Sequence, residues 1–106
     1  MVEIRWTDFA IENLIHIGDY IEQDSVKYAE IVVNEIFDTT EILERHPFIG
    51  RIVPEFSKEH IRELFYGNYR IIYTVVSKEM IDILTIHHSS KLLSKRNYNK
   101  KTINLQ

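Results

Sequence analysis

The stretch from residue 61 to residue 90 reads IRELFYGNYRIIYTVVSKEMIDILTIHHSS and predicts three β-strands joined by two turns. It is rich in Ile, Val, Tyr and Phe, the residues that suit a pleated sheet surface. Gly67-Asn68 fits the two-residue loop of a β-hairpin, and Ser77-Lys78-Glu79 can form a second, looser turn. The stretch therefore predicts an antiparallel three-stranded meander.

The first turn decides which side chains share a face of this sheet. It places Tyr66 opposite Tyr69 and Arg62 opposite Tyr73, and a slip of one residue would exchange the two faces. One face then carries Arg62, Leu64, Tyr66, Tyr69, Ile71 and Tyr73. The other face carries Glu63, Phe65, Arg70, Ile72 and Thr74.

A three-residue second turn extends the same register to the last strand. It predicts His87 opposite Tyr69 and Ile86 opposite Arg70, with His88 diagonal to Arg70. Arginine and histidine side chains in a strand are the first candidates for chemistry.

Two amphipathic helices are predicted before the meander. Thr7 is a suitable N-cap, and apolar residues then recur at helical spacing until about residue 23. Asp24 or Ser25 caps a second helix, which is expected to continue through His46 until Pro47 stops it. Residues 47–55 contain two prolines and a glycine and predict a shaped loop.

A short strand over residues 2–6 is expected at a sheet edge, so the predicted element order is β-α-α-β-β-β. This order predicts an α+β fold with an antiparallel sheet packed on an N-terminal helical hairpin. We expect the helices to cover one sheet face and the face with Arg62 and the tyrosines to stay open for contact with a partner.

Charge is distributed unevenly along the chain, whose formal net charge is −3. Residues 1–45 carry three Lys/Arg and eleven Asp/Glu, a net −8, whereas residues 46–106 carry ten and five, a net +5. The overall acidity disfavours tight, unassisted nucleic-acid binding. The basic half predicts an acidic partner, and residues 94–106 are expected to be a flexible basic tail after a single domain at residues 1–93.

Cysteine is absent, so disulfides and thiolate metal sites are excluded, and a cytoplasmic protein is expected. The apolar runs are too short to span a bilayer. Adjacent histidines on alternating faces do not make a metal site, and no glycine-rich phosphate loop occurs, so no metal or cofactor is expected.

Cationic and histidine side chains could converge at one rim of the sheet. This set consists of Arg51, Arg62, Arg70, His87, His88 and Lys91. Such groups can supply the base, acid and cations that metal-independent RNA cleavage needs. The alternative is structural: Arg70 pairs with Glu63 on its own face, and the histidines merely end a strand.

Several segments in this order resemble the RelE/ParE superfamily of toxins from bacterial type II toxin–antitoxin modules. They are Trp6…Ala10…Leu14…Ile17…Tyr20-Ile21, Pro47…Gly50-Arg51…Val53-Pro54-Glu55, Ile61-Arg62-Glu63-Leu64, Tyr69-Arg70-Ile71-Ile72-Tyr73 and Ile83–His88. The resemblance covers about residues 1–93. It implies the same β-α-α-β-β-β fold and an antitoxin partner whose C-terminal segment wraps the toxin.

The resemblance leaves two activities open. ParE-like toxins of plasmid-stabilisation modules inhibit growth by poisoning DNA gyrase, and the Arg51…Pro54-Glu55 and Ile61–Leu64 pieces look more like this branch. RelE-like toxins are mRNA interferases that cut message on the ribosome. For that alternative the catalytic candidates are Arg62, Arg70, His87 and His88, although Glu63 stands where a RelE-type toxin has lysine.

The favoured interpretation is a ParE-like gyrase inhibitor neutralised by an antitoxin, in a toxin–antitoxin hetero-oligomer. Its expected partner-binding residues are Arg51, Tyr69, Tyr73, Lys91, Lys95 and Arg96. An acidic antitoxin segment is expected to bind the basic side and tail.

Overall fold

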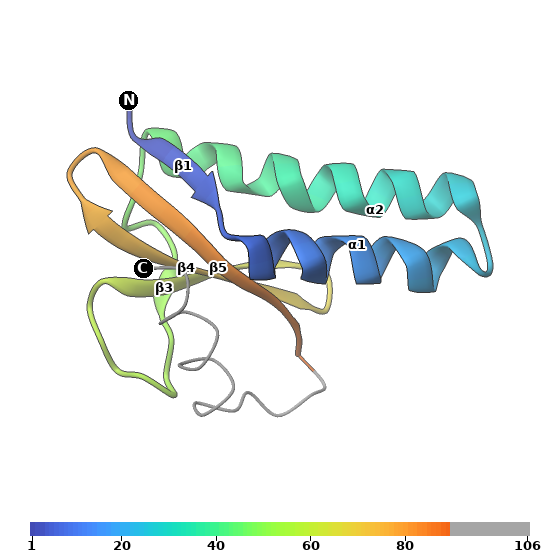
Figure 1. The fold of residues 1–106 in the computed structure, drawn as a ribbon. Helices are drawn as coiled ribbons and strands as arrows, with labels where there is room; N and C mark the ends of the chain where they lie inside the picture. The colour runs from blue at the N-terminus through green and yellow to red at the C-terminus, as the bar shows by residue number, and fades with distance from the viewer. Residues whose placement is uncertain (90–106) are drawn as a thin grey trace.

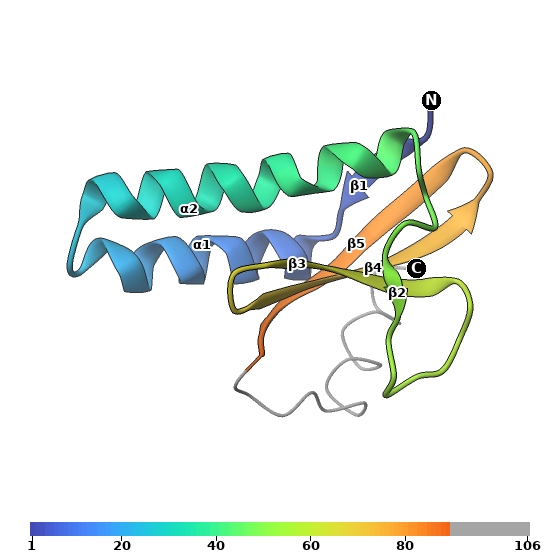
Figure 2. The same cartoon turned by 180° about the vertical axis from the view of Figure 1, so that it is seen from behind.

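The computed structural model describes residues 1–89 and consists of two helices packed on a five-stranded sheet. The helices are α1 (Asp8–Glu22) and α2 (Val26–Thr39), followed by a 3-10 turn, η1 (Thr40–Glu44). The strands are β1 (Glu3–Trp6), β2 (Arg51–Ile52), β3 (Ile61–Tyr66), β4 (Tyr69–Ser77) and β5 (Met80–His88). Figures 1 and 2 show the two helices running side by side, and they pack against one face of the sheet.

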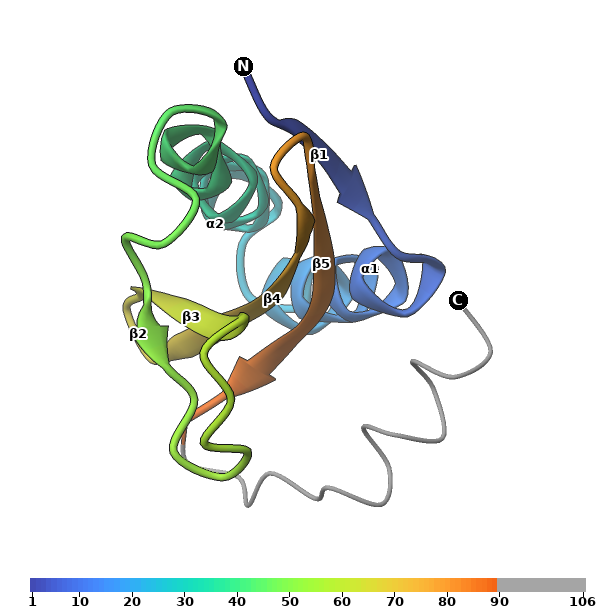
Figure 3. The ribbon, with the colours of Figure 1, turned by 90° about the vertical axis from the view of Figure 1, so that its left-hand side faces the viewer.

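The strand order in the sheet is β1-β5-β4-β3-β2. The predicted α+β fold and the antiparallel meander β3-β4-β5 are confirmed. Strand β1 lies at a sheet edge as predicted, but it pairs in parallel with β5, so the sheet is mixed. Figure 3 shows the twist of the sheet, with β1 beside β5 at one edge and β2 beside β3 at the other.

Both helix starts follow from their capping residues. The Thr7 hydroxyl accepts a hydrogen bond from the Ala10 amide at 3.1 Å, and the Ser25 hydroxyl accepts one from Tyr28 at 3.0 Å. These contacts satisfy amides that the helix itself leaves without partners. Of the two predicted caps for the second helix, the structure uses Ser25.

The second helix ends earlier than predicted. It stops at Thr39, and the next five residues tighten into η1 instead of continuing to His46. The Thr39 hydroxyl donates to the carbonyl of Glu35, and the Thr40 hydroxyl donates to that of Phe37, both at 2.7 Å. Consecutive threonines that bond to preceding carbonyls compete with regular helical geometry.

The hairpin register at the first turn is confirmed, with Tyr66 opposite Tyr69 and Arg62 opposite Tyr73. Gly67 has φ +53°, a conformation that favours glycine. The second turn is shorter than expected, because β4 ends at residue 77 and β5 begins at residue 80.

The register predicted for the end of β5 is wrong by one residue. The structure pairs His88 with Tyr69 and His87 with Arg70, whereas the sequence led us to expect His87 opposite Tyr69 and Ile86 opposite Arg70. His88 therefore takes the place predicted for His87, and His87 takes the place predicted for Ile86.

A bulge at Leu84 causes this shift. Ile83 faces Tyr73, and Thr85 faces Ile72, which leaves Leu84 as an extra residue on β5. Such an insertion moves every later pairing by one position. Leu84 is 3% exposed, so its burial stabilises the bulge.

The two sheet faces carry the predicted side chains, but the open face was assigned wrongly. The main core lies between helices and sheet, and the strand residues in or against it include Leu64, Tyr66, Tyr69, Ile71 and Tyr73. The tyrosine-bearing face is therefore covered by the helices. A smaller cluster on the opposite face consists of Val53, Ile61, Ile72 and Leu84, with Phe56 packed against it.

Candidate functional site

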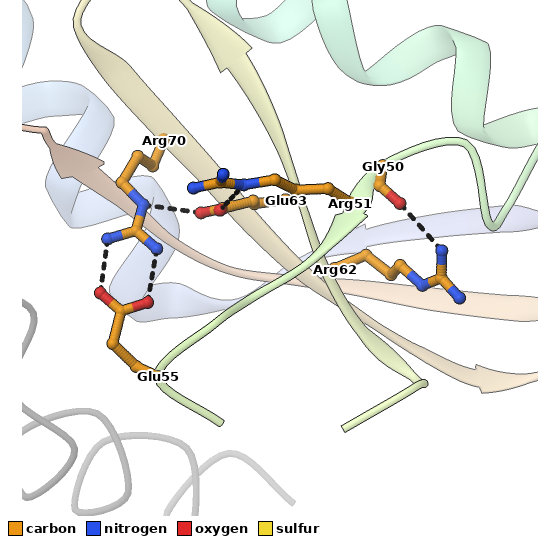
Figure 4. A network of polar contacts seen from close by, with 6 residues as sticks. All are labelled: Gly50, Arg51, Glu55, Arg62, Glu63 and Arg70. Carbon is orange, nitrogen blue, oxygen red and sulfur yellow. Dashed lines mark hydrogen bonds and ion pairs between the residues drawn. The ribbon is translucent and has the colours of Figure 1, made fainter. Parts of the chain in front are cut away.

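Arg70 lies at the centre of an ion-paired network outside the helix-covered core. Its Nη1 and Nη2 each donate to a carboxylate oxygen of Glu55 at 2.8 Å, and its Nε donates to Glu63 at 2.6 Å. Figure 4 shows this two-pronged contact with Glu55 and the side-on contact with Glu63. The Arg70 side chain is 10% exposed, so the network holds it in one orientation.

Arg51 completes the network from strand β2. Its Nε donates to the second oxygen of Glu63 at 2.6 Å, and its guanidinium lies 5.0 Å from the centre of the Phe65 ring. The Glu63 side chain is fully buried, whereas that of Arg51 is 58% exposed. One buried carboxylate thus joins a buried arginine to an exposed one.

The charges of this network cancel, because two guanidinium groups face two carboxylates. The hydrogen bonds from Arg70 lower the pKa of Glu55 to about 2, against the opposing effect of burial. The same contact with Glu55 raises the pKa of Arg70 above its usual value. Both groups of this pair are ionised at neutral pH, as expected for a hydrogen-bonded ion pair.

Arg62 points away from this network and binds the preceding loop (Figure 4). Its Nη1 donates to the carbonyls of Phe48 at 3.1 Å and Gly50 at 3.0 Å, and its Nε donates to that of Glu59 at 2.8 Å. Its guanidinium also lies over the Phe48 ring. Arg62 therefore holds carbonyls of both the loop before β2 and the loop before β3.

Tyr73 is completely buried, so the expectation that it lies on an open contact face is wrong. Its hydroxyl accepts from the Gly50 amide at 3.0 Å and donates to the Pro47 carbonyl at 2.8 Å. A Cβ atom at position 50 would lie 2.6 Å from the carbonyl oxygen of Glu63, so only glycine fits there. Tyr73 and Gly50 together hold the loop before β2 against the sheet.

A groove of about 610 Å³ opens between α1 and the end of β5. Its lining is mainly aromatic, apolar and histidine side chains: Phe9, His16, Ile17, Tyr20, Tyr69, Ile86, His87 and His88, together with Asn13 and Thr85. The ring of His88 meets that of Tyr69 edge-on at 5.2 Å. Burial raises the pKa of Tyr69, with smaller contributions from Tyr28 and Tyr20.

Asn13 ties α1 to β5 inside this groove. Its Oδ1 accepts from the Thr85 hydroxyl at 2.7 Å and from the Ile86 amide at 3.0 Å. The side-chain oxygen of Asn13 thus accepts a hydrogen bond from a β5 amide that lies beyond Ile83, the last β5 residue that pairs with β1.

The predicted rim of cations and histidines is only partly assembled. Arg51 and Arg70 meet through Glu63, but Arg62 turns to the loop, and the histidines line the groove. The pairing of Arg70 with Glu63, raised as the structural alternative, is present. Lys91, Lys95 and Arg96 lie outside the described residues, as does the expected boundary between domain and tail.

Residues 1–89 contain no group of histidines and acids arranged to hold a metal ion. Within the same range, no helix is both long and apolar enough to cross a membrane.

Comparison with protein families matches residues 4–93 to the family described as the ParE toxin of type II toxin–antitoxin system, parDE. The chain belongs to the ParE toxin family.

A solved structure described as the chromosomal ParDE TA system from P. aeruginosa contains a similar chain. That chain is 23% identical, and the two align with a TM-score of 0.69 over 83% of this ParE-family chain and 96% of the other. At this identity the likeness shows a shared fold. No curated protein matches the sequence.

Two residues of the polar contacts described above were missed by sequence reasoning. Glu55 was noted only as part of a loop motif, although Arg70 binds it with two hydrogen bonds. Asn13 was not noted at all. A polar residue between the apolar positions of an amphipathic helix is a usable signal for Asn13, but nothing local to the loop indicates that Glu55 turns back to β4.

Proposed function

We propose that this ParE-family toxin inhibits bacterial growth by binding DNA gyrase and that a cognate antitoxin neutralises it in a hetero-oligomer. Family membership supports a toxin of a parDE module. The observation that favours gyrase binding over RNA cleavage is the ion pairing of Arg70 with Glu55 and Glu63.

A nuclease needs cations that can stabilise the negative charge developing on a phosphate. Arg70 can give a phosphate little charge stabilisation, because two carboxylates already occupy three of its donors and its side chain is 10% exposed. Inserting a phosphate there would require displacing Glu55 and burying further negative charge beside Glu63. The network therefore suits a rigid protein-binding face better than a phosphate clamp.

Arg51 is our main candidate for contact with gyrase within the described residues. It projects from an edge strand and is more than half exposed, and the exposed ring of Phe65 lies under it. Arginine and aromatic side chains are common at the centres of protein interfaces. Tyr69 at the groove, and Lys91, Lys95 and Arg96 beyond residue 89, remain candidates for antitoxin contact.

The test is inhibition of supercoiling by purified gyrase, with two arginine variants compared. Arg51→Gln should raise the toxin concentration needed for half inhibition by about tenfold or more, as expected when an interface arginine is removed. Arg5→Gln is the matched control, because Arg5 is 51% exposed and pairs with Asp82 at the opposite sheet edge. Normal supercoiling in the presence of excess wild-type toxin would refute the proposal.

The alternative of a RelE-like mRNA endonuclease rests on His87 and His88, which line one groove. Primer extension on translated message after induction would show new cleavage sites if this activity is present. Absence of cuts in wild-type cells that have stopped growing would remove this alternative.

A further inference from the structure

The groove between α1 and β5 lies where the described chain ends. Strand β5 ends at His88, which lines the groove, and the Ser89 amide donates to the Asn68 carbonyl at 2.7 Å. Seventeen residues, 90–106, follow from this point. The chain therefore continues from the mouth of a cavity whose volume lies within the usual range of binding pockets.

Acidic side chains border the outer side of this groove along α1. Asp8, Glu12 and Asp19 share one side of the helix by their spacing, next to the groove residue His16. Glu12 and Asp19 are exposed, and no salt bridge among residues 1–89 uses any of the three acids. An uncompensated acidic rim beside an aromatic groove favours an occupant that carries both apolar and cationic side chains.

Residues 90–106 have this composition. They contain five Lys or Arg residues and no acid, and Leu92 and Leu93 come shortly after the groove. An extended chain advances at most about 3.6 Å per residue, so position 93 can lie up to about 14 Å from Ser89. Leu92 and Leu93 are therefore close enough along the chain to reach the groove, and Lys95 and Arg96, which follow them, can reach its rim.

We propose that residues 90–106 occupy the α1–β5 groove of their own chain. Leu92 and Leu93 pack against the apolar lining, and the following cations pair with the acidic rim of α1. Covalent attachment gives the segment an effective concentration in the millimolar range, which favours its own groove over that of a second copy. An acidic partner segment would compete for the same cations and uncover the groove.

Cysteine crosslinking tests this placement, because the natural chain has no cysteine. The reporter is the full chain with Tyr20→Cys and Leu93→Cys, since Tyr20 lines the groove and is 72% exposed. The matched control is Phe65→Cys with Leu93→Cys. Phe65 is 49% exposed. It pairs with Arg70 on β4, which pairs with His87 on β5, so Phe65 lies two strands, or about 10 Å, from His87 across the sheet.

With glutathione disulfide as oxidant, we expect the groove pair to form its intramolecular disulfide about tenfold faster than the control pair. Lys95→Glu with Arg96→Glu, or about 1 M salt, should bring the groove pair towards the control rate. Equal rates for the two pairs would overturn the proposal. Disulfides formed only between chains, seen as dimers on a non-reducing gel, would also overturn it.

Discussion

Replacing Arg70 by methionine should be among the most destabilising single changes in this protein. The substitution keeps an apolar stem of similar length but removes the guanidinium that binds Glu55 and Glu63. The side chain of Glu63 is fully buried, so in this variant it would have one partner fewer in a low-dielectric site. Glu55 is 33% exposed and can turn towards water.

The expected loss follows from this difference in burial. Removing one partner of a buried ion pair costs about 3–5 kcal/mol, because the remaining charge loses its compensation. For a domain of this size, a loss of that order lowers the melting temperature by about 15 °C or more. Urea denaturation, with the slope of the transition checked for constancy, measures the free energy of unfolding directly.

Arg51→Met provides the matched control, because Arg51 binds the other oxygen of the same carboxylate. Arg51 is 58% exposed, so water can enter the space it leaves, and the loss should be about 1 kcal/mol. Converting both Glu63 and Arg70 to methionine should cost less than Arg70→Met alone, since no buried charge would remain unpaired. Equal losses for the two arginine variants, or a loss below about 1 kcal/mol for Arg70→Met, would refute this reasoning.

Three further changes probe other parts of the structure. Arg70 lowers the folded-state pKa of Glu55 to about 2, so this pair stabilises the fold above the unfolded-state pKa near 4.5. Stability should therefore fall as the pH drops from about 5 towards 2, and Glu55→Gln should flatten that part of a plot of unfolding free energy against pH. Tyr73→Phe removes the hydroxyl that bonds the Gly50 amide and should cost about 1–3 kcal/mol in urea denaturation, while hydrogen exchange at that amide accelerates. Asn13→Leu should cost about 1–3 kcal/mol, whereas Asn13→Asp, which keeps an acceptor oxygen, should cost less; similar losses would show that the link to β5 contributes little.

Local signals in the sequence were sufficient for the helix caps and the first hairpin. Thr7 and Ser25 cap through their own hydroxyls, and Gly67 adopts the positive φ its turn requires. These features depend on residues a few positions apart, so the sequence pattern contains them. The pairing of Tyr66 with Tyr69 then follows from the turn alone.

Features that depend on contacts between distant segments could not be predicted in the same way. The bulge at Leu84 exists because a second apolar cluster buries that side chain, and it moves both histidines by one position. The helices cover the tyrosine-bearing face, where Tyr73 is buried in the main core and also bonds a loop through its hydroxyl. Periodicity separates two faces of a sheet but does not say which face the helices will cover.

The position of β5 between β1 and β4 has a consequence for synthesis of the toxin. The strand made last among the described residues is the one that both β1 and β4 need as a neighbour. A nascent chain interrupted before residue 80 would leave β1 without any strand to pair with and would expose one long side of β4. Ribosomes that stop before residue 80 therefore release fragments that lack the strand joining β1 to the rest of the sheet.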